Sequence, residues 1–305
     1  MIAFLLRRFM WFVITVWAVQ SLSFFLVRLA PGGPFTQERN VPLHVELAQR
    51  AKLNLDVPLY EQYFGYFGKL FRFDLGISDR QPDFTVNEII AAGFPVSASL
   101  GVLALLFAVA LGLAAGIVSA VCRGRGWDVS IMAAATLGIA VPSFVVASVV
   151  IILFVFVWPL FPAAGWGEPA NLVLPAFCLG APYAAYIARL SRTGMLEVLS
   201  QDYIRTAYAK GLSTRAVVLR HALRGALLPV FSFLGPAVAG ILTGSLVIEK
   251  IFAIPGLGVH LLNAALQRDF TLMLGMVLVY TTVLYSMNTL VDLSYRILDP
   301  RVELT

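Results

Sequence analysis

Basic side chains cluster between positions 189 and 229, and this cluster is the part of the sequence best suited to binding chemistry. Its bases are opposed by only two acids, Glu197 and Asp202. Cationic side chains at this density hold anionic lipid headgroups or a complementary protein surface. The seven bases are Arg189, Arg192, Arg205, Lys210, Arg215, Arg220 and Arg224.

The spacing inside this cluster predicts two short helices broken at Gly211, with apolar runs on both sides. Ser200 is suited to capping a first helix over roughly Asp202 to Lys210, and Ser213 to capping the second. Gly211 fits the left-handed position that ends a helix. Each helix then has an apolar face: Ile204, Ala207 and Tyr208 on the first, and Leu219, Leu223 and Ala226 on the second.

Catalytic and cofactor motifs are absent from the sequence. It contains no Gly-x4-Gly-Lys-Ser/Thr phosphate loop, no His-Glu-x-x-His and no Gly-x-Ser-x-Gly. His44, His221 and His260 lie far apart, and Cys122 and Cys178 have no metal-ligand spacing. We therefore expect no catalytic residue, no bound cofactor and no metal site, and the chain is not expected to be an enzyme.

Composition predicts that the chain sits in a lipid bilayer. Of its 305 residues 59% are hydrophobic and 13% are charged, whereas soluble domains carry about 25% charged residues. Six runs contain no Asp, Glu, Lys or Arg, and each is long enough to cross a membrane as a helix. The runs are Phe9–Val27, Ile89–Cys122, Val129–Gly167, Pro169–Ala188, Gly225–Ile248 and Phe270–Val291. We predict an all-α polytopic membrane protein with six transmembrane helices.

The interiors of these runs hold no ionisable residue, although such residues mark proton and ion paths in pumps. A proton-coupled secondary transporter or an intramembrane protease is therefore poorly supported. Energy for any transport would have to come from outside the chain.

The distribution of Lys and Arg predicts the orientation. With the N-terminus inside, the inner segments hold 13 of these residues, and the short outer loops hold Lys250 and Arg268. Because positive residues favour the cytoplasmic side, both termini are predicted to be cytoplasmic. The net charge of +5 is explained by this topology and requires no nucleic acid.

The predicted organisation has four parts. Residues 1–30 form the first span, residues 31–92 an external segment, residues 93–293 a core domain of five spans, and residues 294–305 a tail. The core domain contains the basic two-helix element, at residues 196–229. Apolar and aromatic residues from Leu53 to Phe71 recur at near-helical spacing, which predicts a small helical cap on the membrane. Two interpretations of this cap remain open: a surface cap with a structural role only, or a docking site for an external partner.

Several residues are expected to cap, bend or interrupt the spans. Asn87 is a plausible N-cap before the second span, and Pro95 is expected to bend the chain into it. Pro142 lies near the middle of the third span, where it predicts a kink that is either structural or part of a pathway. Residues 249–269 are predicted to form a short outer loop with a tight turn at Pro255-Gly256.

Two glycine pairs have the spacing that lets helices approach closely. They are Gly112 with Gly116 in the second span and Gly240 with Gly244 in the fifth. Tight packing within the chain is the expected use, rather than dimerisation.

The basic element resembles the ATPase-docking loop of ABC importer permeases of the peptide/nickel, binding-protein-dependent, MetI-like family. The resemblance rests on the string from Asp202 to Leu212, on Arg220-His-Ala-Leu-Arg224 and on Leu227-Leu-Pro229. Arg205-Thr-Ala207 replaces the usual Glu-Ala-Ala, and the spacing to Leu-Pro is longer, as is typical of the peptide branch.

The resemblance extends over nearly the whole chain and is strongest to the B subunit of oligopeptide permeases. Further similar stretches are Ala30-Pro-Gly-Gly-Pro-Phe35, Asp74-Leu-Gly-Ile-Ser78, Phe94-Pro-Val-Ser97, Pro142-Ser-Phe-Val-Val-Ala147, Met195-Leu-Glu-Val198, Val247-Ile-Glu-Lys-Ile-Phe252, Ile254-Pro-Gly-Leu-Gly258, Arg268-Asp-Phe270 and Leu298-Asp-Pro-Arg301.

The resemblance implies a type I ABC importer permease fold and a set of partners. These are a second homologous permease, two cytoplasmic ATPases that bind ATP and Mg²⁺, and an external peptide-binding protein. The residues expected to dock the ATPase are Arg205, Thr206, Ala207, Lys210, Gly211, Leu212 and Ser213. Those expected along the translocation path are Pro142, Ser143, Ser232, Thr243 and Ser245. An outer gate loop that meets the binding protein is expected at Phe252, Ile254, Pro255, Gly256 and Leu257.

The function implied is import of oligopeptides across a bacterial inner membrane by alternating access, driven by the partner ATPases. Alternative cargoes of the same transporter class are dipeptides, nickel chelates, glutathione and peptide antibiotics. A secondary transporter is the alternative from a different class.

Overall fold

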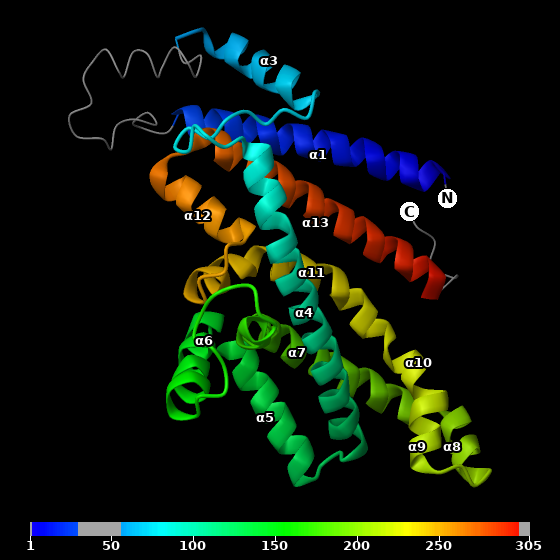
Figure 1. Cartoon of the computed structure of the whole chain (residues 1–305). Helices are drawn as coiled ribbons and strands as arrows, with labels where there is room; N and C mark the ends of the chain where they lie inside the picture. The colour runs from blue at the N-terminus through cyan, green and yellow to red at the C-terminus, as the bar shows by residue number, and fades with distance from the viewer. Residues whose placement is uncertain (1, 30–55, 299–305) are drawn as a thin grey trace. The chain divides into compact units, whose positions relative to one another are not determined.

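The computed structural model describes residues 2–29 and 56–298, and these residues form a succession of helices (Figure 1). Among them the one β-type pairing is an isolated antiparallel bridge between Ile77 and Thr85. The helices are α1 (Ile2–Leu29), α3 (Leu59–Leu70), α4 (Val86–Val121), α5 (Gly126–Ala140), α6 (Ser143–Ile151), the π-helical segment η1 (Ile152–Val157), α7 (Ala170–Leu199), α8 (Asp202–Ala209), α9 (Thr214–Val217), the π-helical segment η2 (Val218–Ala222), α10 (Leu223–Ala226), α11 (Leu228–Ile251), α12 (Leu257–Gln267) and α13 (Phe270–Leu298).

The membrane-spanning prediction agrees with these helices. Four of them, α1, α4, α7 and α13, are long and apolar enough to cross a bilayer. Two bent pairs raise the number of candidate spans to six if each pair is one span. The first pair joins α5 to α6 and η1, and the second joins α9–α10 to α11. Each of the six uncharged runs in the sequence falls on one of these segments.

The chain divides into two compact units. Unit 1 comprises Met1–Val96 and Pro255–Tyr285, and unit 2 comprises Ser97–Ile254 and Ser286–Thr305. Helices α4 and α13 contribute to both. The predicted division at residues 92–93 separates an external segment from a core domain and does not concern compact units. It remains a prediction.

Unit 1 contains the predicted helical cap. Helix α3 packs on α1, where the Tyr66 hydroxyl donates to Gln20 Oε1 at 2.6 Å and the Tyr63 and Ser21 hydroxyls are 2.8 Å apart. Aromatic rings reinforce this contact, with Tyr63 edge-on to Phe24. The cap is therefore helical over residues 59–70. Leu53 and Leu55, which also belong to the predicted cap, lie outside the described residues.

The start of α4 corrects one predicted cap. Thr85 Oγ1 accepts a hydrogen bond from the Glu88 amide at 3.2 Å, and Glu88 Oε2 accepts one from the Thr85 amide at 2.8 Å. This reciprocal pair is a capping box, so Thr85 rather than Asn87 caps the helix. Asn87 instead accepts from the Leu75 amide at 3.0 Å and donates to the Phe73 carbonyl at 2.8 Å, which holds the preceding loop.

In unit 2, α4 approaches α7 closely at the predicted glycine pair. A Cβ at Gly112 would lie 2.7 Å from the Ala184 carbonyl oxygen, and one at Gly116 would lie 2.5 Å from that of Ala188. Both glycines therefore pack within the chain, as predicted. In the second pair, Gly240 lies against the Tyr183 ring, and the side of the helix at Gly244 lies outside the described residues.

The third span is bent far more sharply than a kink. Helices α5 and α6 meet at 110°, with Val141 extended at φ −86° and ψ 125° before Pro142. Steric contact with the proline ring disfavours the helical region for the preceding residue; here Val141 is extended, α5 ends and a new helix begins at Ser143. Pro95, in contrast, lies inside the continuous helix α4, and the bend expected there stays a prediction.

Candidate functional site

The basic cluster folds as the predicted two-helix element, formed by α8 and by α9, η2 and α10 together. The predicted N-cap of its first helix, Ser200, is wrong. Ser200 ends α7, where its hydroxyl donates to the Glu197 carbonyl at 2.7 Å, and α8 begins after Gln201 without a side-chain cap. Only Ser200 and Gln201 therefore separate the end of α7 from the two-helix element.

A left-handed glycine and several hydrogen bonds fix the turn between the two helices. Gly211 has φ +81°, the left-handed conformation predicted for it. Its amide donates to the Tyr208 carbonyl at 2.9 Å, and the Leu212 amide donates to the Ala207 carbonyl at 3.3 Å. Ser213 caps the next helix as predicted, because its hydroxyl oxygen accepts from the Ala216 amide at 3.4 Å.

One side of the element is anchored in a hydrophobic core. Ile204 is 0% exposed, and it shares this core with Ala207, with Met195 of α7 and with Ala120 of α4. The predicted face of α8 is thus confirmed for Ile204 and Ala207, whereas Tyr208 is exposed. The element is attached to two spans by packing, which makes it a rigid projection rather than a free loop.

The predicted face of the second helix is confirmed for Ala226 and wrong for Leu219. Leu219 is 53% exposed, and Val217, Val218 and Ala222 are buried together with Ala226. The π-helical segment η2 changes the number of residues per turn, so the i, i+4 spacing of a regular helix no longer aligns Leu219 with Ala226.

The outward side of the element combines apolar and basic side chains, and we call it the docking surface. Its exposed residues are Tyr203, Arg205, Thr206, Tyr208, Lys210, Leu212, Ser213 and Leu219. Of the predicted docking residues, Ala207 lies on the core side and serves packing. The exposed pair of Arg205 and Asp202, at 3.4 Å, contributes little stability because both groups are solvated.

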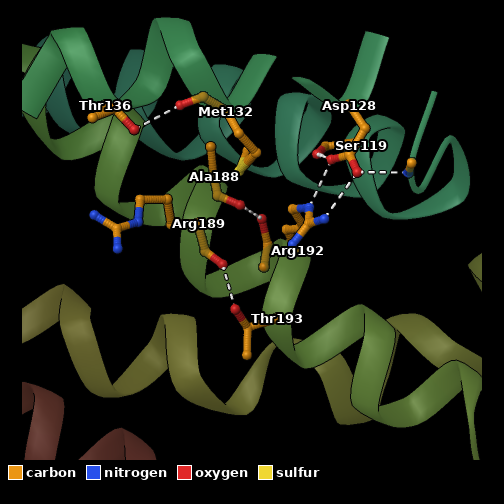
Figure 2. Close-up of polar contacts among 10 residues, drawn as sticks. Ser119, Asp128, Met132, Thr136, Ala188, Arg189, Arg192 and Thr193 are labelled. Carbon is orange, nitrogen blue, oxygen red and sulfur yellow. Dashed lines mark hydrogen bonds and ion pairs between the residues drawn. The ribbon is translucent and has the colours of Figure 1, made fainter. Parts of the chain in front are cut away.

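A buried carboxylate holds the neighbouring chain segments together (Figure 2). Asp128, 4% exposed, accepts two parallel hydrogen bonds from Arg192, from Nε at 2.7 Å and from Nη2 at 2.9 Å. It also accepts from the Ser119 hydroxyl at 2.5 Å and from the Gly124 amide at 2.9 Å. We call Asp128, Arg192, Ser119 and Gly124 the clamp. It joins α4, the α4–α5 turn, α5 and α7.

Sequence reasoning missed the clamp because it counted Arg192 as a topological charge and Asp128 as the boundary of an uncharged run. The available signal was a single acid at the edge of a membrane span, a placement that usually marks a partner. Glu249 was missed similarly: the sequence placed it in an outer loop, but it lies in α11, 0% exposed, and accepts from the Ser97 hydroxyl at 2.7 Å.

The predicted outer loop 249–269 is shorter than expected, and most of the gate residues predicted in it are buried. Phe252 and Ile254 in unit 2 are buried, and the Phe252 carbonyl accepts from the Gly165 amide at 2.9 Å. In unit 1, Pro255 is exposed, whereas Gly256 and Leu257 are buried, and α12 begins at Leu257. Most of the predicted loop 249–269 is therefore helical.

The predicted path residues have different environments. Pro142 and Ser232 are exposed, Ser143 is half-buried and Ser245 is buried. The hydroxyl groups of Ser232 and Ser245 donate to carbonyls of their own helix, Leu228 and Leu242, each at 3.0 Å. The side chain of Thr243 lies outside the described residues.

Comparison with known proteins agrees with this architecture. Residues 112–304 match the family described as "Binding-protein-dependent transport system inner membrane component". The oligopeptide transport system permease protein OppB of Haemophilus influenzae is 44% identical over 304 residues, which cover 99% of each chain. The dipeptide transport system permease protein DppB of Bacillus subtilis is also 44% identical, over 100% of this chain and 99% of that one.

A solved structure has a similar fold. It is described as inward facing conformations of the MetNI methionine ABC transporter, and it aligns with a TM-score of 0.58 at 18% identity. The alignment covers 69% of this chain and 96% of that chain. At this identity the likeness concerns the fold alone.

Proposed function

This chain belongs to the family of binding-protein-dependent transport system inner membrane components, and on that basis we propose that it is a transmembrane permease subunit of an ATP-driven ABC importer. Its cargo is an oligopeptide, in line with the names of its relatives in Haemophilus influenzae and Escherichia coli. The partners are a second permease, two cytoplasmic ATPases and an external peptide-binding protein. The chain lies in a bacterial inner membrane with both termini in the cytoplasm.

The observation that carries this proposal is the docking surface on a rigid element. Exposed Tyr203, Tyr208 and Leu219 offer apolar contact area, and Arg205 and Lys210 add positive charge. Aromatic side chains with basic neighbours suit a protein partner, because aromatic residues and Arg are enriched in protein–protein interfaces. When ATP closes the two ATPases, a docked element moves with them and carries the ends of α7 and α4, to which its core is packed.

The proposed cargo follows from the names of the relatives. A path of apolar and small polar groups suits peptides with varied side chains, whose selection falls to the binding protein. Dipeptides are the second candidate, since one relative with the same identity is named a dipeptide permease. Nickel chelates, glutathione and peptide antibiotics are alternatives of the same transporter class.

The proposal is tested by purifying the tagged chain from its native membrane and assaying vesicles that contain it. We expect two ATPase subunits and a second permease to copurify, and vanadate to stop peptide uptake. Uptake that follows a proton or sodium gradient without ATP would contradict the proposal and support a secondary transporter. Competition among labelled peptides of different lengths, starting from dipeptides, would then separate the cargo classes.

A further inference from the structure

The clamp lies close to the two-helix element, and we propose that Asp128 and Arg192 are positioning residues for energy coupling. In this inference they make the α4–α5 hairpin move with α7 when the docking surface is displaced. The inference rests on the proposed function, because it concerns motion driven by a partner ATPase.

The first step is the position of Arg192. It lies on α7, ten residues before α8 begins at Asp202, and α7 ends only at Leu199. A displacement of the two-helix element therefore reaches Arg192 through Ser200, Gln201 and the last turns of α7. Figure 2 shows the Arg192 guanidinium directed at Asp128 and Ser119, whereas the Arg189 side chain on the same helix points away from them.

The second step concerns Asp128, the other member of the ion pair, and the groups that it binds. The Asp128 carboxylate uses both oxygens to bind Arg192, and it also accepts from Ser119 at the end of α4 and from Gly124 in the turn. A bidentate arginine–carboxylate pair fixes the orientation of both groups as well as their distance. The clamp thereby joins the hairpin formed by α4 and α5 to α7 beside the contacts through which these helices already pack.

The third step is the contact between α4 and α7 beside the clamp. Next to the clamp α4 meets α7 through Gly116, which has no side chain to interlock and would clash with the Ala188 carbonyl if it had one. Small residues of this kind let helix backbones approach closely. The ion pair adds a contact of fixed direction to this close packing. Coupling in proteins is carried by such elements, which keep rigid parts in register.

The experiment measures peptide uptake per ATP hydrolysed in proteoliposomes that contain the whole complex. Arg192→Gln and Asp128→Asn should each lower this ratio about ten-fold, while ATP hydrolysis falls much less. Arg192→Lys should be intermediate, because it keeps the charge and loses the two-pronged contact. Arg189→Gln is the matched control, since it removes the same residue type from the exposed side of the same helix, and it should leave the ratio unchanged.

The double variant Asp128→Asn with Arg192→Gln provides the second measurement. It leaves no uncompensated charge, so it should accumulate in the membrane even if a single variant does not. It should be no more uncoupled than either single variant, because the two residues act as one unit. A normal ratio in the double variant, or equal losses of uptake and hydrolysis in all variants, would overturn the inference. If the unmodified complex shows no ATP-driven uptake, the proposed function fails instead.

Discussion

Ser78 and Asp269 lie 191 residues apart in the chain and meet in unit 1, where the serine hydroxyl donates a hydrogen bond to the carboxylate. The same carboxylate accepts from the Asp79 amide at 3.1 Å and from the Leu272 amide at 3.0 Å. Asp269 therefore caps α13 and holds the loop before α4 at the same time. Each residue belongs to a different short stretch that resembles the peptide permeases.

Replacing Asp269 with Ala should loosen this loop. The variant leaves the Ser78 hydroxyl and the amides of Asp79 and Leu272 without their acceptor, and such a loss costs about 1–3 kcal/mol. We expect a lower midpoint of thermal unfolding and faster proteolysis within residues 71–85. Asp83→Ala, at an exposed acid of the same loop, is the control and should leave both measurements unchanged.

The stability of unit 1 should depend on pH through Asp79. Burial raises the pKa of the Asp79 carboxyl above its ordinary value of 3.8, although hydrogen bonds from Thr271 lower it in part. Because the folded-state pKa is the higher one, this contribution to stability is full below the unfolded pKa and is lost as pH rises through the raised pKa. The unfolding midpoint of the wild type minus that of Asp79→Asn should be largest at acid pH and decrease toward neutrality. A difference that stays constant with pH would contradict this assignment.

Gly211→Val should uncouple transport from ATP hydrolysis. A β-branched residue is strained at φ +81° by about 1–2 kcal/mol, although no neighbouring atom lies in the way of its Cβ. The strain distorts the turn between α8 and α9, so uptake should fall while insertion into the membrane is retained. Gly211→Asn tests the cause, since Asn tolerates the left-handed conformation and should transport nearly normally. Unchanged uptake in the Val variant would argue against a rigid docking element.

Gly116→Ala should destabilise unit 2. The added Cβ would lie 2.5 Å from the Ala188 carbonyl oxygen and 3.0 Å from the Arg192 amide, so the two helices must separate. Overpacking of this kind costs about 1–3 kcal/mol. Thermal unfolding in detergent measures it, with Gly126→Ala as the comparison, because nothing lies within 4 Å of a Cβ at that position.

The outer turn calls for surface variants rather than a deletion. Removing residues 251–259 would take away Phe252 and Ile254, both 1% exposed, and would damage the fold. Pro255→Arg changes an exposed position. If this turn meets the binding protein, Pro255→Arg should reduce uptake stimulated by that protein and leave thermal stability intact. Normal stimulation would make the turn a connector only.

The features that the sequence predicted correctly depend on local composition or spacing. The six uncharged runs located the spans, the spacing of Gly112 and Gly116 indicated a close helix contact, and Gly211 with Ser213 marked the turn of the two-helix element. In each case the physical cause lies within a few residues, either as hydrophobicity over one helix length or as the backbone freedom of one residue.

The errors occurred where a local rule was overridden. Pro142 was expected to kink a helix, but Val141 before it is extended, so the helix ends there and the next one leaves at 110°. Leu219 was expected on the buried face, but a π-helical segment changed the register. Residues 249–269 contain turn signals and polar residues, yet most of them are helical, and burial of Leu257 and Ala264 stabilises α12 there.

By itself, the sequence determined that this chain partitions into a membrane as six apolar segments and that it carries a basic two-helix element between two of them. Those properties follow from transfer free energy and from local backbone preference, both of which add up along the chain. The tertiary structure alone decided that Asp128 meets Arg192 and that Ser78 meets Asp269. Such pairs depend on how distant helices pack against one another, and no periodicity within either segment encodes its partner. The position of the docking surface is therefore a property of the sequence, and its attachment to the spans is a property of the fold.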